Sequence, residues 1–173
     1  MTDTPPDLPN QQMAAKDPPV LYVDADACPV KEEIYRVADR YQLFVVLVSN
    51  SGMRIPLHPR ISQIVVSDAK LDAADDWIAD HIARCDIAVT NDIPLAARCV
   101  SAGGFAVSPT GTVFDEVSIG QQLATRDLMT SLRETGMIQS GGKPMGKSDR
   151  SKFLNALDML VNRSKKLAKT PAG

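Results

Sequence analysis

The sequence predicts one α/β domain with three layers, in which a central, mostly parallel sheet of about five strands carries helices on both faces. Two observations support this fold class. Short apolar runs alternate along the chain with longer segments whose apolar residues recur at helical spacing, which is typical of parallel strands joined by right-handed helical crossovers. The runs are also apolar without interruption, as expected for strands that are buried on both faces.

The predicted elements follow one another in a regular order. Apolar runs bounded by turn residues predict strands at 20–24, 43–48, 61–66, 86–90 and 105–108. Helical periodicity predicts helices from Pro29 to about Tyr41, and at about 72–84, 94–102, 117–135 and 149–165. Pro29 is expected at the first helical position, because its ring fixes a helical φ and that position needs no N–H donor.

A single domain is predicted over residues 20–165, with flexible tails at 1–19 and 166–173. The first tail holds five of the twelve prolines and almost no large apolar side chains, so it cannot bury enough surface to fold. The last residues of the chain, rich in lysine and small side chains, are expected to fray in the same way.

Composition excludes several classes of protein. The 19 basic and 21 acidic residues give a net charge of −2, which argues against a general DNA-coating protein. The longest apolar run, Leu43–Val48, is far shorter than the roughly 20 residues that span a bilayer, and the N-terminus lacks the pattern of a secretory signal. The three cysteines include no Cys-x-x-Cys pair. We therefore expect a cytoplasmic protein with no membrane partner.

Acidic residues follow three of the predicted strands. Asp24 and Asp26 come after the first strand, Asp68 and Asp72 come after the third, and Asp92 comes after the fourth. Because ligands of open parallel sheets bind at the carboxyl ends of the strands, we expect these side chains to meet at one edge. Clustered carboxylates repel one another unless a cation or a shared proton intervenes, and Mg²⁺ or Mn²⁺ suits such an oxygen-rich site.

The predicted helix at 72–84 carries several acids, and its helical phase distinguishes them. At 100° per residue, Ala74 and Ile78 fall on the buried stripe and Asp75 lies at the edge of that stripe. Asp76 and Asp80 fall on the opposite side, toward solvent. Asp75 is therefore the candidate site residue of this helix.

The same residues carry a resemblance to known families. Asp24 after the first strand, Asp75 on a helix and Thr90-Asn91-Asp92 at a strand end resemble the central signature of PIN-domain nucleases. More closely, the motifs VDADACPVK, DAADDWI, VTNDIPLA, SPTG, LATRDLMTSLRETG and SDRSKFLNALD, spread over residues 20–162, resemble the YaiI/YqxD family of bacterial cytosolic proteins. This resemblance implies a PIN-like fold and a candidate acidic site, but no established activity. Two long helices after the last strand depart from an ordinary PIN domain.

Our first hypothesis is a metal-dependent phosphodiesterase of PIN-like type that acts on RNA. Asp24, Asp75 and Asp92 are expected to hold Mg²⁺ or Mn²⁺, with Asp26 as a fourth ligand or general base. Hydrogen bonds from neighbouring side chains are expected to orient these groups, and basic side chains of the last two helices are expected to contact phosphate. The supporting residues are Thr90, Asn91 and Asp72, and the basic ones are Arg126, Arg133, Lys147 and Arg150.

Two alternatives remain open at this point. The chain could be a nucleic-acid- or partner-binding module whose acidic pocket is catalytically weak, because one fold serves many functions. It could also be a haloacid-dehalogenase-like phosphatase, with Asp24 as nucleophile, Asp26 as acid/base and Ser49 on the phosphate. The 25 positions from Asp24 to Ser49 leave no room for a cap, and no Gly-Thr follows Asp26, which argues against the phosphatase.

Overall fold

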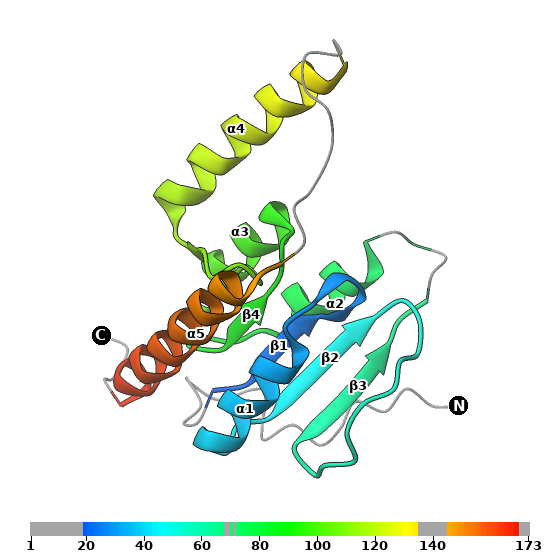
Figure 1. The fold of residues 1–173 in the computed structure, drawn as a ribbon, viewed down its shortest axis with the longest axis vertical. Coiled ribbons are helices and arrows are strands. Elements are labelled where there is room, and N and C mark those ends of the chain that lie inside the picture. The colour runs from blue at the N-terminus through cyan, green and yellow to red at the C-terminus, as the bar shows by residue number, and fades with distance from the viewer. Residues whose placement is uncertain (1–18, 68–69, 71, 135–144, 170–173) are drawn as a thin grey trace.

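Six strands form one sheet, and helices cover both of its faces (Figure 1). This computed structural model describes residues 19–67, 70, 72–134 and 145–169, with side chains for all of these except 27 and 126–134. The strands are β1 (Leu21–Asp24), β2 (Val45–Ser49), β3 (Ile61–Val65), β4 (Ile87–Val89), β5 (Phe105–Val107) and β6 (Val113–Phe114). The helices are α1 (Lys31–Tyr41), α2 (Ala73–His81), α3 (Ile93–Ser101), α4 (Glu116–Glu134) and α5 (Lys147–Ala168), and a short 3₁₀ helix, η1 (Ala25–Ala27), follows β1.

The strand order is β3-β2-β1-β4-β5-β6, and every neighbouring pair is parallel except the last. The chain moves from β1 outward to β3, and then returns to the other side of β1 to form β4. The order therefore reverses between β1 and β4. In doubly wound sheets, the crevice beyond the carboxyl ends of the strands at such a reversal is where ligands bind.

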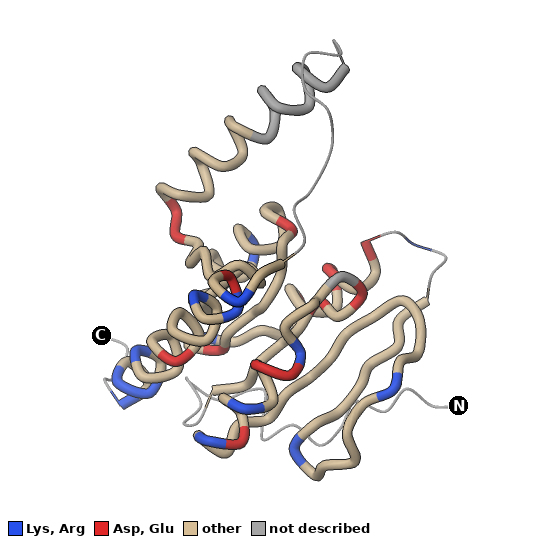
Figure 2. Tube along the Cα trace, viewed as in Figure 1, with Lys and Arg blue, Asp and Glu red and all other residues tan. Residues whose placement is uncertain are grey.

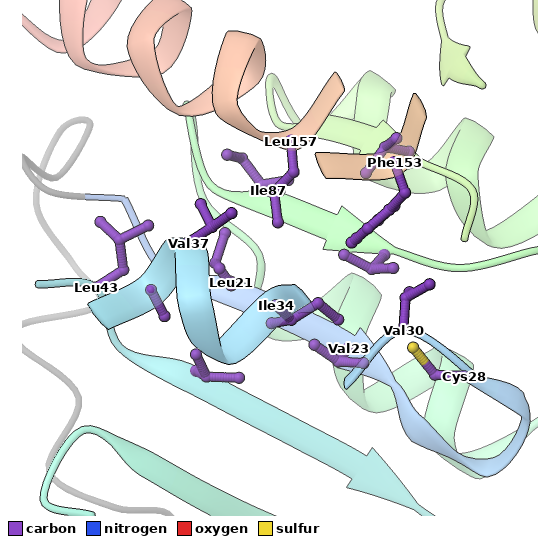
Figure 3. Packing of buried hydrophobic residues seen from close by; sticks show 14 of the residues in the cluster. Leu21, Val23, Cys28, Val30, Ile34, Val37, Leu43, Ile87, Phe153 and Leu157 are labelled. Carbon is purple, nitrogen blue, oxygen red and sulfur yellow. The ribbon is translucent and has the colours of Figure 1, made fainter. Parts of the chain in front are cut away.

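Alternate residues of each strand face two separate cores. Leu21 and Val23 of β1 pack with α1 and α5, whereas Tyr22 packs with α2 and α3 on the opposite face. Figure 3 shows the first core, in which Phe153 and Leu157 of α5 lie against the sheet beside α1. Both of these side chains are fully buried, and burial of each contributes roughly 1.5–3 kcal/mol to folding. The even-numbered residues of β1 thus point to the α2/α3 side, and this parity continues to Asp24.

The predicted α/β class and the helices on both faces are confirmed. The short antiparallel strand β6 was not predicted, because two residues after the turn at Gly111 carry no strand periodicity. Pro29 is not the first helical residue: α1 begins at Lys31 and Val30 occupies the N-cap with φ −113°. Helix α2 is shorter than predicted, because Ile82 adopts an extended conformation.

Helix α5 runs past its predicted end at residue 165, to Ala168. Two contacts to the segment before β4 hold its last turns in place. The hydroxyl of the buried Ser164 donates to the carbonyl oxygen of Cys85, and Arg84 donates to the carbonyl oxygen of Leu167. Of the two predicted tails, residues 1–18 and 170–173 lie outside the described part of the chain. None of the described helices is both long and apolar enough to cross a membrane.

Candidate acidic site

Asp24 and Thr90 meet at the point where the strand order reverses. The parallel register pairs Val23 of β1 with Val89 of β4, so the next residue of each strand emerges at the same edge of the sheet. The Thr90 hydroxyl donates a hydrogen bond of 3.0 Å to Oδ2 of Asp24. Thr90 is buried and Asp24 is partly buried. The hydrogen bond fixes Oδ2 of Asp24 and leaves Oδ1 for other contacts.

Asp92 is held in place by the start of α3. Its backbone N–H donates to the Thr90 hydroxyl oxygen at 2.9 Å, and its Oδ1 accepts from the N–H of Leu95 at 2.8 Å. Asp92 is therefore the N-cap of α3, a position where a carboxylate satisfies a free N–H and interacts favourably with the helix dipole. Asp24, Asn91, Asp92 and Ile93 line an open pocket at this edge. Asn91 is exposed in it.

Asp75 joins these two carboxylates from α2. Its neighbours Ala74 and Ile78 are buried against the sheet, so Asp75 lies beside the core and is only partly exposed. The pKa of Asp75 is raised to about 6, mainly by burial and further by the negative charges of Asp92 and Asp24. The three acids predicted to hold a metal ion thus lie near enough to one another for their charges to interact.

Asp24 experiences the same mixture of burial and like charge. Burial raises the pKa of Asp24, and the carboxylates of Asp26 and Asp92 raise it further. The hydrogen bond from Thr90 opposes this shift, because it stabilises the ionised form. A cation that enters such a carboxylate cluster lowers its free energy, because it neutralises the repelling charges.

Asp76 has a different environment, although it follows Asp75 directly. Its two oxygens bind Lys70 at 2.7 Å and Arg98 at 2.8 Å, and these hydrogen bonds lower its pKa. Asp72 is exposed at the N-cap of α2, where its side chain makes no capping hydrogen bond, and Asp80 is exposed as well. Asp76 is therefore already neutralised by two cations, whereas Asp75 is not.

Asp26 connects the site to the end of β2. It is exposed on η1, and its Oδ2 accepts a hydrogen bond of 2.9 Å from the N–H of Asn50. The Oδ1 atom of Asn50 is buried without a hydrogen-bond partner among the described residues. No role was predicted for Asn50, although its place after a buried strand, at the same edge as the acids, is a signal that could have identified it.

The predicted phosphate-binding side chains are only partly described. Arg150 binds α1 and the residues just before it. Its Nη1 lies 3.2 Å from Oε1 of the buried Glu33 and 3.0 Å from the carbonyl oxygen of Pro29. It therefore joins α5 to α1, a role that its position in the sequence did not reveal. Lys147 is exposed at the first turn of α5. The side chains of Arg126 and Arg133 lie outside the described part of the structure.

The donor chemistry of the site fits a hard divalent ion, but the side chains are not arranged as a complete ligand set. Among the described residues, no three Asp, Glu, His or Cys side chains lie close enough together to hold a metal ion. Mg²⁺ usually keeps several waters and needs only one or two protein carboxylates. Asp24 and Asp92, each with one oxygen fixed by a hydrogen bond, are the residues best placed to supply them.

Comparison with known proteins establishes the family. The model of the family described as "Uncharacterized BCR, YaiI/YqxD family" matches residues 22–163. The chain belongs to the YaiI/YqxD family. The match spans the acidic residues of the site and all of the sheet except the first residue of β1.

Similar proteins of this family occur in several bacteria. A UPF0178 protein of Azorhizobium caulinodans is 52% identical over 155 residues, which cover 89% of this chain and 97% of that protein. A UPF0178 protein of Rhodopseudomonas palustris is 53% identical, and the alignment covers 83% of this chain and 90% of that protein. A UPF0178 protein of Caulobacter sp. (strain K31) is also 53% identical, and the alignment covers 87% of this chain and 99% of that protein. No solved structure matches the chain, so its similarity to PIN domains remains an expectation from the sequence.

Proposed function

We propose that this protein is a divalent-metal-dependent phosphodiesterase that cleaves RNA. The observation that carries the proposal is that Asp24 and Asp92 lie at the reversal of strand order, with Asp75 near enough that burial and their charges raise its pKa to about 6. Strongly perturbed carboxyl groups at a ligand-binding edge are typical of catalytic sites. The sequence resemblance to PIN-domain nucleases supports the same assignment.

Each acidic residue has a role that its surroundings support. Asp24 and Asp92 present carboxylates fixed by Thr90 and by the N–H of Leu95, and both would contact the metal ion. A bound Mg²⁺ or Mn²⁺ would supply charge neutralisation at the phosphoryl group and lower the pKa of an attacking water. Asp75 lies near these two carboxylates and would add a third negative charge to the metal site. Asp26 would be a fourth ligand or the general base, held toward the site by Asn50.

The proposal is tested by cleavage of single-stranded RNA in Mn²⁺, with EDTA as the metal-free control. We expect wild-type protein to cleave only with metal, and Asp24→Asn to lose at least about 10²-fold in rate, the contribution of a typical catalytic group. Asp76→Asn, which changes the charge equally, should keep activity within a few-fold. Cleavage that survives both EDTA and Asp24→Asn would indicate a contaminating nuclease and contradict the proposal.

Metal binding has a readout that does not depend on activity. Mn²⁺ should raise the melting temperature, because an ion that binds only the folded state stabilises it and relieves repulsion among the acids. Asp24→Asn should raise the melting temperature of the metal-free protein and weaken the response to Mn²⁺. The same melting temperature with and without saturating Mn²⁺ would count against the metal site.

A second candidate function is an RNA- or partner-binding module with a weak catalytic site. It is favoured by the lack of a three-residue metal arrangement among the described side chains. Binding of RNA without cleavage in Mn²⁺ would select this candidate. The phosphatase hypothesis gains no support, because Ser49 is fully buried and its hydroxyl donates to the carbonyl oxygen of Ser51 at 2.6 Å.

A further inference from the structure

The C-terminal half of α5 carries a group of basic residues at the edge of the sheet opposite the acidic site. Figure 2 shows basic positions gathered toward the C-terminal end of this helix. An open pocket there is lined by Asn162, Arg163, Lys165, Lys166 and Lys169, with no acidic residue among them. We call these five residues the α5 basic surface. Because the whole chain has a net charge of −2, this local excess of positive charge is not a property of the average surface.

Contacts of α5 place this surface at the amino ends of the strands. Early in the helix, Arg150 contacts Pro29, which lies just beyond the carboxyl end of β1. Near its end, Ser164 contacts Cys85, which lies just before the amino end of β4. An α-helix rises about 1.5 Å per residue, so Lys147 and Arg163 lie about 25 Å apart along the axis. The α5 basic surface and the acidic site therefore cannot contact the same phosphate.

Three cations of this surface have no carboxylate partner among the described residues. Within the described part of the chain, no carboxylate lies within 4.0 Å of the charged groups of Arg163, Lys165 or Lys169. The acid nearest in sequence on this helix, Asp158, already binds Arg40 and the hydroxyl of Tyr41. The positive charges of Arg163, Lys165 and Lys169 therefore repel one another without a neighbouring carboxylate, and a bound polyanion would relieve this repulsion.

Aromatic rings lie beneath two of these cations. The guanidinium of Arg163 is 5.7 Å from the centre of the Phe105 ring, and the ammonium of Lys165 is 5.4 Å from the centre of the Tyr41 ring. Both rings are partly exposed. Cations beside accessible rings are the combination that single-stranded nucleic acids contact, since the cations bind phosphates and the rings stack with bases. The dipole of α5 favours cations only in its last turn, so it does not account for Arg163.

We infer that the α5 basic surface is a second binding site for the phosphate backbone of single-stranded RNA, remote from the acidic site. The inference rests on the proposed function for the identity of the ligand. RNA held there would extend toward the acidic site, and the local concentration of substrate would rise without any contribution to the chemistry. The site should therefore affect binding, and its effect should be sensitive to salt.

The test measures binding of fluorescent single-stranded RNA by anisotropy in EDTA, over a series of salt concentrations. For single strands, each phosphate contact contributes about 0.7 to the slope of log affinity against log salt. The double variant Arg163→Gln/Lys169→Gln should therefore lower that slope by about 1.4 and weaken binding at low salt. The control Arg36→Gln/Arg54→Gln removes the same charge from two exposed residues elsewhere and should leave the slope within error. Equal slopes in the two double variants would overturn the inference.

Two further measurements separate RNA binding from a folding defect and from lipid binding. Loss of the contact between Arg163 and Phe105 could perturb folding of the double variant. Lys169→Gln alone avoids this, because it changes one exposed residue after the end of α5. It should lower the slope of log affinity against log salt by about 0.7. Vesicles of phosphatidylglycerol test the membrane as the alternative polyanion. Binding to vesicles that depends on Arg163 and Lys169, without any effect on RNA, would overturn the inference in favour of lipid.

The inference and the proposed function fail in different ways. A protein that cleaves RNA but whose affinity is unchanged in the double variant would keep the acidic site and lose the α5 basic surface. A protein that binds RNA through Arg163 and Lys169 but never cleaves it would keep this surface and lose the phosphodiesterase. Absence of RNA binding by the wild-type chain would overturn the inference.

Discussion

The Thr90 hydroxyl connects two aspartates that the chain separates by many residues. It donates to Oδ2 of Asp24, which lies 66 residues earlier, and its oxygen accepts from the backbone N–H of Asp92. One buried side chain thus orients the carboxylate after β1 and the backbone that begins α3. The two hydrogen bonds make Thr90 a positioning residue for Asp24 and Asp92.

Thr90→Val should separate this positioning role from simple packing, because valine has nearly the same shape but no hydroxyl. We expect a loss of about 1–3 kcal/mol in unfolding free energy, since the N–H of Asp92 loses its acceptor. The pKa of Asp24 should rise further, since the opposing hydrogen bond is gone. Urea denaturation and NMR titration of the carboxyl carbons measure the two effects. Thr125→Val, which removes an exposed hydroxyl on α4, should change neither.

The acidic site should make the stability of the metal-free protein fall as the pH rises. The pKa of Asp75 is raised from 3.8 to about 6, so its carboxyl group binds a proton more tightly in the folded state than in the unfolded state. Its stabilising contribution is therefore complete below about pH 4 and is lost as the pH rises through about 6.

Asp75→Asn should reduce this dependence, because asparagine resembles the protonated acid, and the raised pKa of Asp24 should account for the dependence that remains. The variant should be more stable than wild type near neutral pH by about 1 kcal/mol, a value reduced for the partial exposure of the side chain. Denaturation can be followed through Trp77, the single tryptophan, which lies on the same helix. A wild-type protein that gains stability between about pH 4 and 7 relative to Asp75→Asn would show that the sign is wrong.

Activity should distinguish Asp75 from Asp76. Asp75→Asn should depress RNA cleavage by at least about 10²-fold, as expected for loss of a catalytic carboxylate. Asp76→Asn should leave cleavage within a few-fold and change stability little, because the two ion pairs that it weakens, with Lys70 and Arg98, are exposed to solvent. The comparison is made in Mn²⁺ at temperatures where both variants are folded. A loss confined to Asp76→Asn would place the site on the other face of α2.

Arg150 should contribute to stability, whereas Lys147 should contribute to RNA binding. Arg150→Gln leaves the buried Glu33 carboxylate without its cation and should lower unfolding free energy by about 1–3 kcal/mol. Lys147→Gln changes an exposed residue and should leave stability within about 0.5 kcal/mol. If Lys147 contacts phosphate, this variant should weaken RNA binding. Chemical denaturation together with RNA titration checks both statements, and a reversed pattern would assign the structural role to Lys147.

Most of the fold could be predicted from local sequence signals. Apolar runs locate the five longer strands, and helical periodicity locates the five α-helices of the described residues to within a few residues at most ends. The signals fail where an element depends on distant contacts. β6 forms because Phe114 pairs with Ala106, and the last turns of α5 are held by Cys85 and Arg84. Neither contact leaves a periodic pattern in the sequence.

The sequence by itself determined which acids follow strands and which face of α2 carries Asp75, because both depend on periodicities of a few residues. Only the tertiary structure decided that β1 and β4 are neighbours, and hence that Asp24 meets Thr90 and lies close enough to Asp75 to raise its pKa. It also decided that Arg150 forms an ion pair with Glu33, and that the cations late in α5 lie far from the acidic site. Spacing along a chain sets local geometry, whereas the partner of a charge depends on how the strands are ordered and how the helices pack.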